Sequence, residues 1–192
     1  CYGEADDAER FAFFSKASME FLHKSNRQPD IIHCHDWHTG LIPVFQTEVY
    51  QHLGLRDSRT CYTIHNFKHQ GICGEEILCA TDLNRPEYYF SPDRLGDNTY
   101  KSALNLMKGG IVYSDFVTTV SPTHALEAKK PEQGFGLEKT LQIHHEKFEG
   151  VINGIDMKAW NPQDDRFITE NYSVQSIERK LENKRALREC LQ

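Results

Sequence analysis

The segment PDIIHCHDWHTGLIPVFQTEVYQHL, residues 29–53, decides the fold expected of this chain. Its first part, Pro29 to Asp36, is a short run with the β-rich character of a strand. After Trp37 the apolar residues fall at helical spacing, and Pro43 lies near the first helical turn, where a missing N–H costs nothing. The segment therefore predicts a strand followed by a helix.

The same order recurs along the chain. Further strands are predicted in RTCYTIHNF (59–67), DFVTTVS (115–121) and EGVINGID (149–156), the last breaking at Asn153-Gly154. Further helices are predicted at 8–25, in SALNLMKGGIVYS (102–114), in THALEAKK (123–130) and in GLEKTLQIHHEKF (136–148). Strands that alternate with helices predict an α/β fold, in which a parallel sheet is flanked by helices.

Two stretches depart from this alternation. Residues 71–98 have no clean period and are expected to form a loop-rich insertion. The tail after Trp160 begins as a polar linker and becomes a charged helix from about Val174, with few apolar anchors of its own. Such a helix is expected to need a neighbour for its apolar side.

Composition excludes two classes of partner. With 39% hydrophobic and 26% charged residues the chain is expected to fold, and its formal net charge of −6 argues against nucleic acid, whose phosphates require a basic surface. No run approaches the eighteen or so apolar residues of a membrane span. We therefore expect neither nucleic acid nor a membrane as partner.

Polar residues follow the predicted strands at the points where these end. In an open parallel sheet, ligands bind at the carboxyl ends of the strands, and Asp36, His65 to Phe67, Ser121 and Asn153 all occupy such ends. Ser121 precedes a proline, which favours an N-cap of the next helix. For Asp36 a helix cap and a binding role remain equally open. Lys108-Gly109-Gly110 lacks the spacing of a phosphate loop and is interpreted as a helix-packing site.

The pattern HCHDWH, residues 33–38, raises a metal-site alternative. His33 and His35 share one face of the predicted strand, and an H-x-H pair can bind a divalent metal. A metallo-β-lactamase-like hydrolase requires H-x-H-x-D-H, whereas Asp36 comes one position early, on the opposite strand face. An amidohydrolase-type site would need further ligands, for which His65 is the one candidate.

The segment HNFKHQG, residues 65–71, carries a different chemistry. It places two imidazoles, a carboxamide and an ammonium group on a turn that ends in glycine. Neutral donors and acceptors of this kind suit sugar hydroxyls, and Lys68 could meet an anion.

Taken together, four segments resemble consecutive landmarks of the bacterial glycogen synthase and plant starch synthase family. They are PDIIHCHDWHTGL, YTIHNFKHQG, MKGGIVYSDFVTTVSPTHALE and GVINGIDMKAWNPQDD. The resemblance extends over nearly the whole chain, and HNFKHQG and LNRPEYYFSPDRLGDN are most similar to the starch synthase III/IV-like branch, which has cyanobacterial members. It implies the N-terminal, Rossmann-like half of a GT-B glycosyltransferase.

This resemblance also implies an activity and a site. The family transfers glucose from ADP-glucose to the non-reducing end of an α-1,4-glucan with retention of anomeric configuration, and it needs neither a metal nor another cofactor. By resemblance, His65 is the active-site histidine that contacts the donor glucose, with Asn66 beside it. Asp36 is expected near the acceptor glucan, and Asn153 at the sugar pocket. These groups would position hydroxyls and favour a developing positive charge.

The resemblance further implies a domain organisation. Residues 1–162 are expected to form part of the N-terminal, acceptor-side domain, and residues 163–192 a linker and helix that lead to a C-terminal domain absent from this chain. The family's lysine- and glycine-rich donor loop is also expected outside it. Without these segments the isolated chain is predicted to be inactive, and a non-catalytic glucan-binding module is the alternative. The expected compartment is a bacterial cytoplasm, or alternatively a plastid stroma.

Overall fold

The computed structural model describes residues 3–191. The chain forms two compact units, one that ends at Ile152 and one that begins at Asn153. The boundary predicted at 162/163 concerns the domains of a longer protein and stays a prediction.

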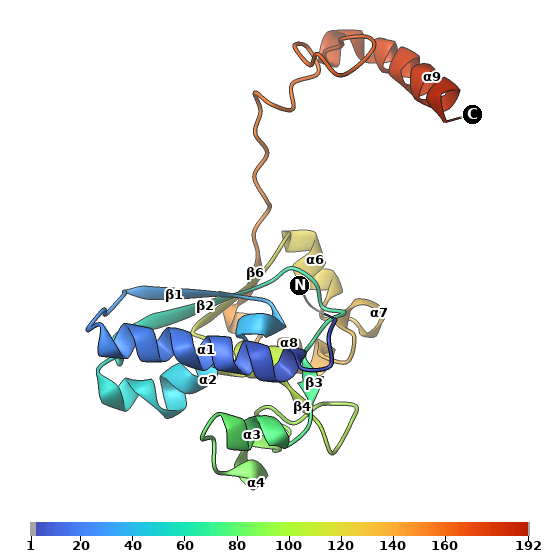
Figure 1. Ribbon diagram of the computed structural model, residues 1–192. Coiled ribbons are helices and arrows are strands. Elements are labelled where there is room, and N and C mark those ends of the chain that lie inside the picture. Colours follow the sequence, from blue (N-terminus) through green and yellow to red (C-terminus); the bar gives the residue numbers. More distant parts are fainter. Residues whose placement is uncertain (1–2, 192) are drawn as a thin grey trace. The chain divides into compact units, whose positions relative to one another are not determined.

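The first unit is built on a parallel sheet of four strands (Figure 1). The strand order is β1 (Ile31–His35), β2 (Arg59–Ile64), β5 (Phe116–Thr119) and β6 (Phe148–Gly150), and every neighbouring pair is parallel. The predicted α/β fold with a parallel sheet is therefore confirmed.

The last strand is shorter than its sequence suggests. β6 ends at Gly150, whereas the apolar pattern predicted a strand through Ile152. Gly150 pairs with Thr119, the last residue of β5, so only one further bond, from Val151 N to Thr119 O at 2.8 Å, extends the ladder. The prediction was wrong at this end because a strand continues only as far as its partner does.

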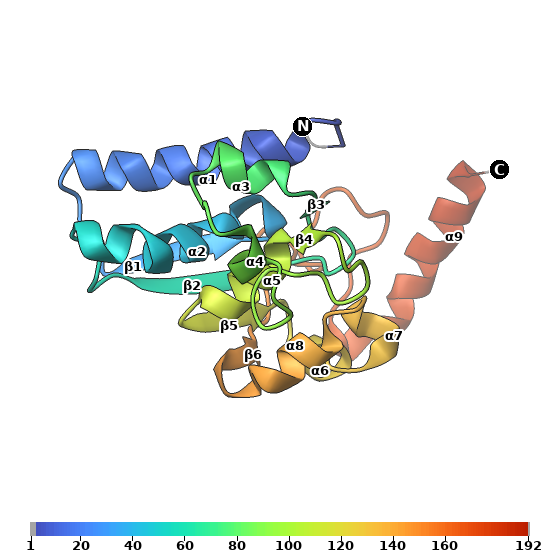
Figure 2. The ribbon, with the colours of Figure 1, turned by 90° about the horizontal axis from the view of Figure 1, so that it is seen from below.

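Helices connect the strands in the predicted order (Figure 2). They are α1 (Asp7–Lys24), α2 (Leu41–Glu48), α5 (Leu106–Tyr113), α6 (Pro122–Glu127), α7 (Pro131–Gly134) and α8 (Glu138–Ile143), with short 3₁₀ turns η1 (Trp37–Thr39), η2 (Tyr50–Leu53) and η3 (His145–Lys147). The helix expected over 40–53 is thus divided at Val49 into α2 and η2. Ser121 caps α6 as predicted, because its Oγ accepts a hydrogen bond from His124 N at 3.0 Å.

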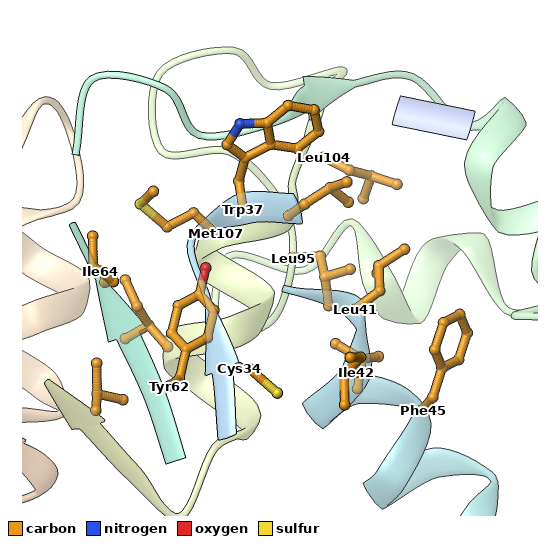
Figure 3. Packing of buried hydrophobic residues seen from close by; sticks show 14 of the residues in the cluster. Cys34, Trp37, Leu41, Ile42, Phe45, Tyr62, Ile64, Leu95, Leu104 and Met107 are labelled. Atoms are coloured by element: carbon orange, nitrogen blue, oxygen red, sulfur yellow. The ribbon is translucent and has the colours of Figure 1, made fainter. Parts of the chain in front are cut away.

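The two faces of the sheet differ in composition. One face, here called the core face, carries a row in which Cys34, Tyr62, Val117 and Phe148 pair across the strands, and all four are at most 3% exposed. Figure 3 shows Cys34 and Tyr62 among the apolar side chains of this core. The opposite face, here called the polar face, carries His33, His35, Thr63 and Thr118.

Helix α5 lies close against the core face. A Cβ atom at Gly110 would stand 2.4 Å from the ring of Tyr62, a distance that real Cβ contacts do not show. A Cβ at Gly40, just before α2, would meet the carbonyl oxygen of Leu106 at 2.2 Å. Gly110 therefore serves helix packing, as the sequence predicted for the Lys108-Gly109-Gly110 segment.

The insertion predicted at 71–98 is loop-rich but contributes to the core. It contains β3 (Ile72–Cys73), α3 (Glu76–Ala80) and α4 (Pro86–Tyr89), and β3 pairs antiparallel with β4 (Leu104–Asn105). Its apolar residues at 77, 78, 83, 89 and 95 are at most 2% exposed.

The second unit contains the predicted tail helix in two parts, η4 (Val174–Arg179) and α9 (Lys180–Cys190). A capping box links Ser173 and Ser176 at its start. Several apolar side chains of this unit remain exposed, among them Ile177, Leu181 and Leu187. Across residues 3–191, none of the helices has both the length and the apolar character that a membrane crossing requires.

Lys147 gives the first unit a testable pH dependence. Its ammonium donates to the carbonyl oxygens of Val112 at 2.8 Å and Ser114 at 2.6 Å, and burial lowers its pKa to about 8. The pKa in the unfolded chain is about 10.4, so between pH 8 and 10.4 the folded state binds fewer protons and the free energy of unfolding rises with pH. We expect wild type to gain about 2 kcal/mol relative to Lys147→Met between pH 7 and 10. Urea unfolding across this range measures the difference, and parallel pH curves for the two proteins would contradict it.

Candidate functional site

The ends of β1 and β2 bring two predicted site residues together. His35 pairs with Thr63 in the parallel ladder, and Asp36 N donates to Thr63 O at 2.9 Å. Asp36 follows β1 and His65 follows β2, so the two residues lie side by side at the carboxyl edge of the sheet. The structure therefore places Asp36 and His65 at the same edge of the sheet.

Asp36 holds the turn that follows β2. Its Oδ1 accepts hydrogen bonds from His65 N at 2.8 Å and Asn66 N at 3.3 Å. No side-chain cap is formed on the helical turn that begins at Trp37, so a helix-capping role for Asp36 is wrong. Its carboxylate instead fixes the backbone of the neighbouring strand end.

The backbone of Asp36 is strained in a way that serves this role. Its φ of 53° and ψ of −178° lie in a region that is almost confined to glycine. An aspartate persists there only where surrounding contacts impose the conformation, and such residues cluster at functional sites. The strain turns the chain so that successive side chains, His35 and Asp36, both reach the residue after β2.

Three imidazoles gather on the polar face beside this turn. His35 Nδ1 lies 3.1 Å from His65 Nε2, and the rings of His33 and His35 are 4.2 Å apart. His33 Nε2 lies 2.7 Å from Thr63 Oγ1, which in turn contacts Thr118 Oγ1 at 2.7 Å. Burial lowers the pKa of His35, and the neighbouring His33 and His65 lower it further.

The geometry does not support a metal site at His33 and His35. Among residues 3–191, no three His, Cys, Asp or Glu side chains are arranged to hold a metal ion. The two imidazoles are hydrogen-bonded to Thr63 and His65 instead.

Buried contacts support the turn at 65–71. Gly71 has a φ of 63°, and a Cβ there would stand 2.3 Å from the ring of the buried Trp37. Gln70 is buried, and its Nε2 donates to Phe67 O at 2.8 Å and Phe135 O at 2.9 Å. Asn66 and Lys68, by contrast, are exposed. The turn is therefore rigid at its base and presents polar groups at its surface.

A buried polar network continues beneath the turn. Asn105 Nδ2 donates to Gln70 Oε1 at 2.6 Å and to Asp97 Oδ2 at 2.8 Å. Lys108 is 1% exposed, and its ammonium donates to Gly96 O at 2.5 Å and Asn98 Oδ1 at 2.7 Å. Burial lowers the pKa of Lys108. The insertion thus acts as a hydrogen-bonded support for the turn.

Asn153, the remaining predicted site residue, belongs to the second unit and is exposed. Its predicted place beside His65 stays a prediction.

The fold and this edge define a class of protein. A parallel α/β sheet whose carboxyl edge carries a fixed turn with exposed imidazole and carboxamide groups, held by a half-buried carboxylate, is typical of a Rossmann-like domain, in which ligands bind at that edge. The chain belongs to the starch synthase catalytic domain family, whose model matches residues 1–143.

Curated relatives agree with this membership. The chain is 62% identical over 190 residues to glycogen synthase 1 of Synechococcus sp. (strain JA-3-3Ab) and 60% identical to glycogen synthase 2 of Methylococcus capsulatus. Each alignment covers 99% of this chain and 39% of the relative. Probable starch synthase 4 of Arabidopsis thaliana is 43% identical, with 99% of this chain and 18% of the relative covered. The chain thus spans well under half the length of these relatives.

A solved structure agrees as well. The catalytic domain of starch synthase IV from Arabidopsis thaliana, bound to ADP and acarbose, matches with a TM-score of 0.81 and 43% identity. The match covers 99% of this chain and 38% of that one.

Sequence reasoning missed part of the site. It considered His35 only as half of a metal pair and Lys108 only as part of a helix-packing segment, and it gave no role to Gln70 or Asn105. The H-x-H pattern did identify the correct strand face. A lysine isolated between apolar residues in a helix, as in NLMKGGIV, was the available signal for the buried ammonium.

Proposed function

We propose that this chain is the acceptor-side, N-terminal part of a retaining glucosyltransferase. The whole protein would transfer glucose from ADP-glucose to the non-reducing end of an α-1,4-glucan. One observation carries the proposal: Asp36 holds the His65-Asn66 turn at the sheet edge, in a chain 62% identical to a glycogen synthase. The ADP and acarbose bound to the related starch synthase IV support an adenine nucleotide and a carbohydrate as ligands.

Each residue has a proposed task. His65 and Asn66 offer neutral donors and acceptors to hydroxyls of the donor glucose, and fixed groups of this kind orient a substrate without reorganising during the reaction. Asp36 keeps both in place with Oδ1 and faces the acceptor with its remaining oxygen. Asn153 contributes a carboxamide to the same sugar. No metal or other cofactor takes part, and His65 need not act as a nucleophile.

The charge of the departing ADP needs partners from elsewhere. Enzymes stabilise the negative charge of a departing diphosphate with lysine or arginine side chains. Lys68 is the one such residue on the 65–71 turn. We propose that the segments which relatives carry beyond this chain supply the other cations. The isolated chain would therefore be inactive.

A chimera tests the proposal. The matching 190 residues of the Synechococcus glycogen synthase are replaced by this chain, and transfer from ADP-glucose to glycogen is measured. We expect the chimera to retain activity within about tenfold of the parent, because at 62% identity the substitutions where this chain meets the rest of the parent should cost little. We expect the isolated chain to show no transfer.

The controls give each outcome a meaning. The parent with the same segment deleted should show no transfer. A folded chimera that binds glycogen but transfers no glucose would favour the non-catalytic glucan-binding alternative. Transfer by the isolated chain would contradict the proposed source of the diphosphate partners.

A further inference from the structure

Two successive residues at the end of β1 act on His65 from different sides. Asp36 binds the backbone, since its Oδ1 accepts from His65 N at 2.8 Å. His35 binds the ring, with His35 Nδ1 at 3.1 Å from His65 Nε2 and the ring planes 29° apart. The position and the rotation of the His65 imidazole are therefore both determined by contacts from the neighbouring strand.

The contact between the two rings restricts their protons. A hydrogen bond between two imidazole nitrogens needs one N–H and one lone pair, so His35 Nδ1 and His65 Nε2 cannot both be protonated or both be bare. Because Nε2 of His65 is occupied in this way, Nδ1 is its ring nitrogen left for a ligand. Within residues 3–191 that Nδ1 has no hydrogen-bond partner.

His35 is itself held firmly. Thr39 Oγ1 accepts from His35 N at 2.6 Å and donates to His35 O at 2.8 Å. The ring of His33 packs at 4.2 Å, and His33 is fixed in turn by Thr63. A ring with this support can impose a geometry on its neighbour.

We propose that His35 is a positioning residue for His65: it selects one tautomer of His65 and fixes its ring plane, so that Nδ1 is presented to the ligand. The identification of the ligand as a sugar hydroxyl rests on the proposed function. The selection of the His65 tautomer is independent of that function.

The first experiment uses ¹⁵N NMR of the histidine rings in this chain without any substrate. In wild type, the ring nitrogens of His65 should show one tautomer. In His35→Phe, they should move to averaged tautomer values. The matched control is His33→Phe, which replaces one aromatic ring packed on His35 by another and leaves the partner of His65 in place, and it should keep the wild-type tautomer of His65.

A second measurement uses the chimera. His35→Phe should lower kcat about 10- to 100-fold with a change in KM for ADP-glucose below about threefold, since a misdirected group affects the transition state more than ground-state binding. His35→Asn, which keeps a polar atom near the position of Nδ1, should recover most of that loss. A merely structural role would give no such recovery.

The two proposals fail separately. Averaged tautomers in wild-type His65, or an unchanged tautomer in His35→Phe, would overturn the positioning role whatever the chimera does. A fixed tautomer together with an inactive wild-type chimera would instead overturn the proposed function.

Discussion

Replacing Asp36 by alanine is expected to lower kcat/KM for glucosyl transfer in the chimera about 10³-fold. The substitution removes the acceptor that holds both His65 N and Asn66 N, so two proposed sugar contacts lose their position together. A displacement of about 1 Å at a reacting centre costs around 10²-fold, and a lost charged group adds to it. Initial rates at varied ADP-glucose and glycogen measure the effect.

Asp36→Asn separates the two contributions of this side chain. An asparagine keeps an oxygen for both amides but loses the charge, so the expected loss is only about 10- to 100-fold. In NMR spectra of this chain, the amide signals of His65 and Asn66 should shift strongly in Asp36→Ala and little in Asp36→Asn. An Asp36→Ala chimera that retains activity within about threefold would show that the anchor is dispensable.

Gly110→Ala is expected to destabilise the first unit by about 2–3 kcal/mol, although alanine is the better helix former. The added methyl group would meet Tyr62 ring atoms at 2.4, 2.6 and 2.7 Å. Tyr62 is fully buried and cannot move aside without disturbing the row of core-face residues. The steric cost therefore exceeds the helix gain of about 0.5–1 kcal/mol. Urea unfolding followed by circular dichroism measures the difference.

The adjacent glycine provides a matched control. A Cβ at Gly109 would meet only the ends of Leu95 at 3.1 Å and Val44 at 3.3 Å, which are flexible side chains. Gly109→Ala should therefore change the free energy of unfolding by less than about 1 kcal/mol. Tyr62→Leu should restore part of the stability lost in Gly110→Ala, as expected for residues in contact. Equal losses at the two glycines would contradict this account of α5.

Much of the fold was predictable because it depends on local spacing. A strand within 29–36, a helix within 102–114 and the cap at Ser121 all follow from the positions of apolar residues, proline and hydroxyl groups within a few residues. The helix begins only at Leu106, because Leu104 and Asn105 pair with β3. The boundaries were less predictable. β6 ends where β5 ends, because its ladder partner sets that limit. The helix after Gly40 stops at Glu48, because Val49 has a non-helical φ of −126°.

The position of the candidate site was predictable from the sequence, but the contacts within the site were not. Strand ends identified Asp36, His65 and Asn66, since a parallel sheet brings such ends to one edge. They could not show that Asp36 binds backbone amides rather than capping a helix, or that the ring of His35 contacts that of His65. The place of Asn153 at the sugar pocket stays a prediction.

The sequence by itself determined the alternation of strands and helices, the α/β class, the edge at which polar groups gather and the resemblance to glycogen and starch synthases. Only the tertiary structure decided which atoms meet there. His35 and His65 are 30 residues apart, and their contact depends on the register in which β1 pairs with β2. A shift of one residue would send His35 to the other face of the sheet, and no pattern within either segment fixes that register.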